Sequence, residues 1–253
     1  MLLEIKDLTK NFGGLAAVSD FSMDVAEGEI VGLIGPNGAG KSTVFNLITG
    51  VLPATSGTIV FDGHDITKKL PDQVARLGIG RTFQLNPLFP DFTVLENVTS
   101  SFDLHPRSTL FDIFFNTGKY RRNEAFIQVK AREILELVGL DKVADELAKN
   151  LPHGHQKMLG VARALATKPR LLLLDEPLAG MNPGEIQDSL DAIRSMRANG
   201  ITVLIVEHNM QILTLCDRVV VISFGKKITE GLPEEVRANT EVISAYFGTD
   251  YVC

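Results

Sequence analysis

The sequence predicts an α/β fold with a mixed, largely parallel sheet, an N-terminal antiparallel β portion and an inserted helical subdomain. Two apolar runs, 171–174 and 201–206, end in acidic residues and flank a segment of helical periodicity, which is typical of buried parallel strands joined by a crossover helix. Polar and apolar residues alternate over 21–25, which predicts a half-exposed antiparallel strand. Apolar residues spaced three and four apart over 131–138 predict a helix near the middle of the chain.

The N-terminal part is expected to place a glycine-rich turn between a strand and a helix. Residues 29–34 are almost all apolar and lead into this turn, and a helix is expected from Lys41 to a stop at Gly50. A further strand at 58–61 ends in Asp-Gly, a pair typical of tight turns. This strand extends the antiparallel portion to which 21–25 also belongs.

In the C-terminal part, the two apolar runs frame the predicted crossover. The first follows Pro169 and ends in Asp-Glu-Pro at 175–177, as expected when the carboxyl end of a buried strand reaches a site. A helix is expected around 186–193, with Gly200 beyond its end. The second run then ends in Glu-His at 207–208. Strand, helix and strand in this order predict a parallel pair.

The chain is expected to form a single domain over 1–253. No repeat, low-complexity tract or flexible linker divides it. Residues of about 1–84 and 168–253 are expected to form one part of this domain, which includes the antiparallel β portion and the glycine-rich turn. Residues of about 85–167 are expected to form the helical subdomain. A chain of this length should bury roughly 70 to 75% of its unfolded surface.

The composition argues against several classes of protein. No apolar run approaches the ~18 to 20 residues needed to cross a bilayer, and the first residues lack the features of a secretory signal, so we expect a cytoplasmic protein. The two cysteines, Cys216 and Cys253, are too few for a disulfide framework. A net charge of −6 and a pI near 5.4 argue against a nucleic-acid-binding surface.

The strongest motif is the glycine-rich turn, which fits the pattern G-x-x-x-x-G-K-[ST] between the expected strand and helix. Glycines let successive backbone N–H groups surround phosphates, and the helix start favours negative charge. Lys41 is expected to reach the terminal phosphates, and the Ser42 hydroxyl is expected to ligate Mg²⁺. The pattern therefore predicts binding of ATP or ADP with Mg²⁺. The residues assigned to the nucleotide are Gly35, Pro36, Asn37, Gly38, Ala39, Gly40, Lys41, Ser42 and Thr43.

Two adjacent acids at the end of the first apolar run predict the rest of the chemistry. Asp175 fits the acid that holds Mg²⁺ through water in P-loop NTPases, and Glu176 is placed to polarise an attacking water. Taken alone, the two acids could equally cap a helix or face solvent. Beside a phosphate-binding loop they predict hydrolysis rather than binding alone.

Further motifs follow in the order found in the nucleotide-binding subunits of ABC transporters, and the sequence strongly resembles that family over essentially its whole length. Arg-Thr-Phe-Gln at 81–84 resembles the Q-loop, which implies that Gln84 contacts Mg²⁺ and the lytic water. His208 resembles the switch histidine that contacts the γ-phosphate. Phe12 stands at the place of the adenine-stacking aromatic residue, with Val18 on the same face. Without the resemblance, the Gln would be interpreted as an exposed polar residue, the His as structural and the Phe as a core residue.

The segment at 151–156 departs from the family pattern. Leu-Pro-His-Gly-His-Gln stands where the family usually has Leu-Ser-Gly-Gly-Gln-Gln, which covers the γ-phosphate of ATP on the partner subunit. Pro152 offers neither a hydroxyl nor an N–H, whereas His153 and His155 could donate instead or could face solvent. A second departure is Asn182, where the family usually has aspartate, which puts charge-based communication between the two sites in doubt. The signature residues assigned to nucleotide are Pro152, His153, Gly154, His155 and Gln156.

These departures, with the run Glu-Pro-Leu-Ala-Gly-Met-Asn-Pro and a long insert over about 103–126, resemble the subfamily that powers branched-chain amino-acid importers. The insert could contact a partner or lipid headgroups, or it could form the core of the helical lobe with a solvated basic flank. Its aromatic, apolar and basic residues are Phe111, Ile113, Phe114, Phe115, Lys119, Arg121 and Arg122.

The resemblance implies the ATP-hydrolysing motor subunit of an ABC importer, acting as a dimer that encloses two ATP molecules across a two-fold interface. The implied partners are a second ATPase subunit, identical or not, membrane-spanning permease subunits and, indirectly, a solute-binding protein, at the inner face of the cell membrane. A urea or short-amide importer, or another ABC transporter, is the alternative.

Other classes are less favoured. A non-transport ABC ATPase usually carries tandem cassettes or long coiled coils, and this acidic single cassette has neither. A small GTPase usually has Asn-Lys-x-Asp, and no Asn-Lys pair occurs in the chain. A P-loop kinase gives no reason for the paired acids.

Overall fold

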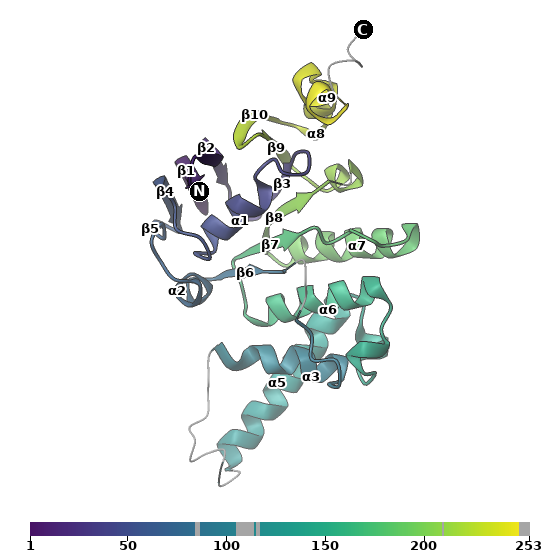
Figure 1. The fold of residues 1–253 in the computed structure, drawn as a ribbon. Helices are drawn as coiled ribbons and strands as arrows, with labels where there is room; N and C mark the ends of the chain where they lie inside the picture. The colour runs from purple at the N-terminus through teal and green to yellow at the C-terminus, as the bar shows by residue number, and fades with distance from the viewer. Residues whose placement is uncertain (84–86, 105–113, 115–116, 209, 248–253) are drawn as a thin grey trace.

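The computed structural model describes residues 1–83, 87–104, 114, 117–208 and 210–247, and this part of the chain forms two sheets and a group of helices (Figure 1). The larger sheet has six strands in the order β10-β9-β3-β8-β7-β6, and the smaller has four in the order β2-β1-β4-β5. The strands of the larger sheet are β3 (Ile30–Ile34), β6 (Ile79–Arg81), β7 (Leu171–Asp175), β8 (Thr202–Glu207), β9 (Arg218–Ser223) and β10 (Lys226–Gly231). Those of the smaller sheet are β1 (Leu3–Phe12), β2 (Leu15–Val25), β4 (Ser56–Phe61) and β5 (His64–Asp65).

The directions of the strands confirm the predicted mixed α/β fold. In the larger sheet β3 runs parallel to both β8 and β9, β7 runs parallel to β6 and β8, and only the β9–β10 pair is antiparallel. The smaller sheet is antiparallel throughout. The strand expected at 21–25 lies in β2, and the strand expected at 58–61 lies in β4.

The central strands are apolar except at their ends because both faces of the larger sheet are covered. In β7 the side chains of Leu172 and Leu174 belong to one buried cluster, and those of Leu171 and Leu173 belong to another. The first cluster lies under the helices on one face, and the second lies between the two sheets and around α1. Side chains alternate across a strand, so each strand contributes to both cores, and no polar position interrupts the run.

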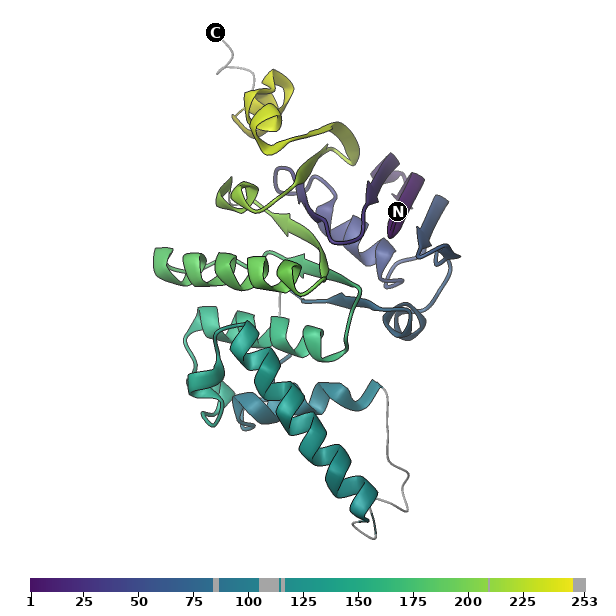
Figure 2. The same cartoon turned by 180° about the vertical axis from the view of Figure 1, so that it is seen from behind.

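The helices fall into two groups on opposite sides of the larger sheet. Helix α1 (Lys41–Ile48) lies between the two sheets, whereas α3 (Val94–Thr99), α5 (Gly118–Leu137) and α6 (His153–Ala166) lie together beyond α7 (Pro183–Ala198) in both views (Figures 1 and 2). The expected helix at 131–138 is the end of α5, and the expected crossover helix is α7. The other helices are α2 (Pro71–Arg76), α8 (Pro233–Ala238) and α9 (Thr240–Phe247).

Helix boundaries follow local capping chemistry. Thr93 caps α3 by accepting from the backbone N–H of Glu96, whose carboxylate accepts from the N–H of Thr93, and this reciprocal pair satisfies two N–H groups at the helix start. Asn182 caps α7 in the same way with Glu185. The described part of the chain contains no helix long and apolar enough to span a membrane.

Candidate functional site

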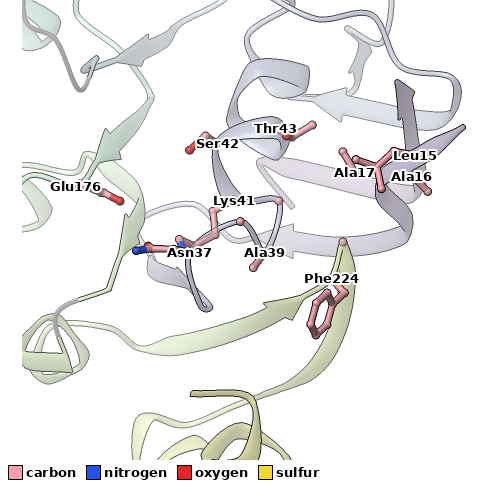
Figure 3. A pocket seen from close by; sticks show the side chains of 13 residues that line it. Leu15, Ala16, Ala17, Asn37, Ala39, Lys41, Ser42, Thr43, Glu176 and Phe224 are labelled. Carbon is pink, nitrogen blue, oxygen red and sulfur yellow. The ribbon is translucent and has the colours of Figure 1, made fainter. Parts of the chain in front are cut away.

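A cavity of about 380 Å³ opens where the loop between β3 and α1 meets the turn between β9 and β10 (Figure 3). Its size suits a small-molecule ligand. The loop is the glycine-rich motif, and Glu176 from the end of β7 completes the lining. The lining residues are Leu15, Ala16, Ala17, Asn37, Gly38, Ala39, Gly40, Lys41, Ser42, Thr43, Glu176, Phe224 and Gly225.

The loop can adopt this conformation only because glycine stands at two positions where its backbone lies against a neighbouring strand. A Cβ at Gly35 would lie 2.1 Å from the backbone oxygen of Ile222, and one at Gly40 would lie 2.7 Å from that of Ala17. Gly40 also has a φ of 109°, a conformation that side chains rarely tolerate. These contacts hold the loop against β9 and β2, so its backbone is shaped before any ligand binds.

Lys41 begins α1 and is almost completely buried. Its Nζ donates to the backbone oxygens of Gly35 at 2.6 Å and Pro36 at 2.9 Å. Burial lowers the pKa of the ammonium, and the carboxylates of Glu176 and Asp175 oppose this shift. The loop oxygens and the acids therefore stabilise a cation in the lining of the cavity, where it can meet phosphate.

Asp175 ends β7 with its side chain only 7% exposed. Its carboxylate Oδ2 accepts from Nη2 of Arg81 at 2.9 Å, and its backbone N–H donates to Oγ1 of Thr82 at 3.1 Å. Both partners belong to the segment that the sequence singled out for Gln84 alone. Gln84 itself lies outside the described residues, so its contacts with Mg²⁺ and water stay a prediction.

Glu176 follows Asp175 in a left-handed conformation, with a φ of 49°. Its backbone N–H donates to the oxygen of Val206 at 2.9 Å, and its backbone oxygen accepts from Nζ of Lys157 at 2.8 Å. Its side chain points toward the phosphate-binding loop (Figure 3), and Nδ1 of His208 lies 3.8 Å from its Oε1. The structure thus brings together the predicted base and the predicted switch histidine.

Glu207 is a part of this site that the sequence reasoning passed over. It is completely buried, and its carboxylate accepts from the backbone N–H of Leu178 at 2.8 Å and of His208 at 3.0 Å. One side chain therefore joins the turn after Glu176 to the end of β8. An acid directly after the apolar run 203–206 of this strand was the available signal.

Phe12 and Val18, the residues expected beside the base, are not among the residues that line the cavity, and their contact with the base stays a prediction. Phe12 ends β1, is 47% exposed and has Nζ of Lys10 5.0 Å from its ring centroid, but it is not among the cavity residues. Val18 is completely buried in the core between the sheets. Phe224, in the β9–β10 turn, lines the cavity and is 91% exposed. A large apolar residue in a turn was the signal that could have found it.

The signature segment lies at the start of α6, away from the cavity of its own subunit. Pro152 is the N-cap residue, and both it and His153 are exposed. Gly154 is buried beside Glu185, where a Cβ would lie 2.7 Å from a carboxylate carbon. His155 lines a second cavity of about 410 Å³ between α5, α6 and α7. Gln156 donates to the backbone oxygen of Leu151 at 3.0 Å.

Much of the predicted insert falls outside the described residues, including Phe111, Ile113 and Phe115. Phe114 is 84% exposed, and Lys119, Arg121 and Arg122 lie on the first turn and a half of α5. The choice between a contact surface and a lobe core for this segment therefore stays a prediction.

Comparison with known proteins identifies the family. The model of the ABC transporter family matches residues 18–179, and a model described as branched-chain amino acid ATP-binding cassette transporter matches residues 226–252. The high-affinity branched-chain amino acid transport ATP-binding protein BraF of Pseudomonas aeruginosa is 41% identical over 249 residues, which cover 98% of both chains.

Solved structures agree with the sequence comparison. The ADP conformation of an ATP-binding cassette of an ABC transporter has a TM-score of 0.85 and 34% identity, covering 98% of each chain. The dimeric structure of a bacterial ABC transporter cassette has a TM-score of 0.78 and 25% identity, covering 91% of this chain and 98% of that one. With the phosphate-binding loop, the paired acids and the strand order described above, these likenesses show that the chain belongs to the ABC transporter family.

Proposed function

We propose that this chain hydrolyses Mg-ATP as the motor subunit of a transporter for branched-chain amino acids. The observation that carries the proposal is the cavity in which Lys41, the glycine loop and Glu176 converge. The solute class is supported by a relative named for branched-chain amino acid transport that matches 98% of the chain, and by the match of 226–252 to a model of the same description.

The residues around the cavity suit a nucleoside triphosphate. The backbone of 35–40 and the buried ammonium of Lys41 would hold the phosphates at the start of α1, where N–H groups and the helix field favour negative charge. The exposed aromatic face of Phe224, and that of Phe12 at the end of β1, would contact the base. Ser42 and Thr43 follow Lys41 in the first turn of the helix and line the same cavity.

The donor set also suits Mg²⁺. This ion is usually bound by one or two carboxylates together with substrate phosphates, and it keeps several waters. The Ser42 hydroxyl and the Asp175 carboxylate supply such a partial set, with Gln84 as a further predicted ligand. Among the described residues no group of three or more His, Cys, Asp and Glu side chains could hold a metal alone, in keeping with a site that phosphates complete. When bound, Mg²⁺ would neutralise charge that develops on the phosphates.

The chain's own residues would then act on the attacking water. Glu176 would orient this water and accept its proton. The backbone that carries its carboxylate is fixed by the bond from its N–H to Val206 and by the bond that its oxygen accepts from Lys157. His208 would contact the terminal phosphate from the end of β8. Glu207 fixes the backbone next to both residues, so the geometry exists before the substrate arrives.

A second subunit would complete the site. The signature residues Pro152 to Gln156 do not line the cavity of their own subunit, while Pro152 and His153 are exposed. In a two-fold dimer they would cover the nucleotide of the partner subunit, as the likeness to a dimeric cassette supports. Closure of the dimer would move the helical subdomain, about 85–167, and the membrane-spanning permease subunits bound to it. A peripheral position at the inner face of the membrane follows from this proposal.

The test is ATP hydrolysis and oligomeric state measured together for the unaltered chain and for Glu176→Gln. We expect the variant to bind ATP, lose turnover and accumulate as a dimer in Mg-ATP. A variant that hydrolyses at the original rate would show that Glu176 is not the base. Loss of turnover without dimerisation would indicate that a different partner subunit completes the site.

The transported solute needs a separate test in cells. Uptake of labelled leucine, isoleucine and valine, and of urea as the alternative, is compared between cells with the intact chain and cells with Lys41→Ala. Loss of branched-chain uptake alone supports the proposal, and loss of urea uptake alone would replace it with the alternative solute class.

A further inference from the structure

We propose that Arg81 is a positioning residue that holds the Asp175 carboxylate at a set distance from the helix that carries Ser42. The inference rests on the proposed Mg²⁺ site, because Asp175 and Ser42 are the two described ligands of that site. It assigns a role to the last residue of β6, which the motif at 81–84 contains without a stated function.

The contact between Arg81 and Asp175 is buried on both sides. Nη2 of Arg81 lies 2.9 Å from Oδ2 of Asp175, and each side chain is only 7% exposed. Among the hydrogen bonds made by the described residues, this is the one that engages the carboxylate, so Oδ1 is the oxygen left for other partners. A charge-assisted hydrogen bond out of water is strong and directional, and it therefore selects one orientation of the carboxyl group.

The guanidinium is itself anchored to α1. Nη1 of Arg81 donates to Oδ1 of Asn46 at 2.7 Å and to Oγ1 of Thr49 at 3.2 Å. Phenylalanine rings lie near it, with centroids 5.5 Å away for Phe45 and 5.0 Å away for Phe83. A planar group that donates to two acceptors at α1 and is bounded by rings keeps its position, so the carboxylate must adjust to the guanidinium.

This anchoring links the two proposed ligands of the metal. Asn46 lies four residues after Ser42, which places both on one face of α1, and Asp175 lies at the end of β7. Arg81 is bonded to Asn46 and to Asp175 at once. One side chain therefore sets the separation between the helix that supplies the hydroxyl and the strand that supplies the carboxylate.

A purely electrostatic role for Arg81 predicts the opposite effect. A fixed positive charge beside Asp175 would repel Mg²⁺, so removing it would strengthen binding of the cation. If Arg81 acts through position, removing it leaves the carboxylate free to turn away and weakens binding of the cation. The sign of the change separates the two roles.

The measurement is the Mg²⁺ dependence of ADP binding, which requires no turnover. A fluorescent ADP analogue is titrated into the protein in EDTA and at increasing Mg²⁺, and the half-saturating Mg²⁺ concentration for the tightening is compared between variants. For Arg81→Met we expect this concentration to rise roughly tenfold, the size of effect that follows from losing one charge-assisted hydrogen bond. Affinity in EDTA should stay within about twofold, because Arg81 does not line the cavity.

Asn46→Ala tests position without removing the charge. Alanine suits a helix interior, so this variant should fold even if Arg81→Met does not, which circular dichroism will report. We expect its half-saturating Mg²⁺ to rise in the same direction, about threefold or more. Arg170→Met is the matched control, because Arg170 forms ion pairs with Glu27 and Asp62 on the surface and should leave the Mg²⁺ dependence unchanged.

An unchanged or lowered half-saturating Mg²⁺ in Asn46→Ala and in folded Arg81→Met would overturn the inference. Asp175→Asn separates this failure from failure of the metal site itself. If Mg²⁺ tightens ADP binding equally in Asp175→Asn and in the unaltered chain, the proposed Mg²⁺ site is wrong whatever Arg81 does. If the tightening is lost in Asp175→Asn but kept at its original Mg²⁺ dependence in the other two variants, only the role of Arg81 is refuted.

Discussion

Replacing Phe224 by asparagine is expected to stabilise the fold and to weaken nucleotide binding. Phe224 has a φ of 47°, in the left-handed region that costs a residue with a large side chain about 1 kcal/mol or more. Asparagine tolerates this conformation far better. Because the ring is 91% exposed, little apolar burial is lost when it is removed.

The magnitudes follow from these two properties. Relief of the backbone strain should raise the free energy of unfolding by about 1 kcal/mol, which corresponds to roughly 2 to 4 °C in Tm for a chain of this length. If the ring contacts the base, its removal should cost about 1 to 2 kcal/mol of stacking, or roughly 5- to 30-fold in ATP affinity. The two changes have opposite consequences for the protein and can be measured independently.

Thermal unfolding followed by circular dichroism gives Tm, and titration with a fluorescent ATP analogue gives affinity. Phe12→Asn is the matched variant, because it removes an exposed aromatic residue without a left-handed backbone. Weakened binding in only one of the two variants identifies which ring contacts the base. A lower Tm in Phe224→Asn would refute the strain argument, and unchanged affinity would refute the contact between Phe224 and the nucleotide.

Three further outcomes are expected. Burial raises the pKa of Glu29, but hydrogen bonds from Arg218 and Ala26 outweigh this and leave the pKa below its usual 4.5. The stabilisation that the ionised Glu29 carboxylate contributes to the fold is therefore present above pH 4.5. It is lost as the pH falls through the lowered pKa of Glu29. Arg218→Met should lower the free energy of unfolding by roughly 2 kcal/mol at pH 7, and denaturant titrations should show this difference shrinking as the pH falls below 4.5. A difference independent of pH would contradict the pairing. Burial raises the pKa of the Cys216 thiol to about 12. In a Cys253→Ser variant, Cys216 should therefore react with a maleimide at pH 8 only after unfolding. Rapid labelling of the folded variant would contradict this burial. Glu207→Gln replaces one acceptor oxygen by an N–H₂ group that faces a backbone N–H. We expect turnover to fall at least tenfold, while nucleotide affinity in EDTA is kept. Normal turnover would show that Glu207 does not hold the catalytic turns.

Asn182 illustrates how a departure from a family motif can keep its structural role. Its side chain accepts from the backbone N–H groups of Gly184 and Glu185 at the start of α7. Asparagine caps helices about as well as aspartate, so the turn needs no charge at this position. The exposed histidine of the signature, His153, lies against this region, because a Cβ at Gly180 would be 3.3 Å from its ring.

The sequence by itself determined the elements whose signals are local. The spacing of glycines before Lys41 predicts a phosphate-binding loop, since backbone N–H groups must converge within a few residues. The apolar runs before Asp175 and Glu207 predict strands buried on both faces, and β7 and β8 have this character because one core lies on each side of the sheet. Periodicity predicts the last turns of α5 and the middle of α7, because one face of each of these segments packs on the core under the helices.

Only the tertiary structure decided which distant residues share the site. Arg81 meets Asp175 across 94 positions of sequence because β6 pairs with β7, and Phe224 reaches the cavity because β9 pairs with β3. Strand order places these residues together, and strand order is set by packing of the whole sheet rather than by any local pattern. The loop and the acids could therefore be predicted from sequence, whereas the side chains that hold them in place depended on contacts that only the folded chain makes.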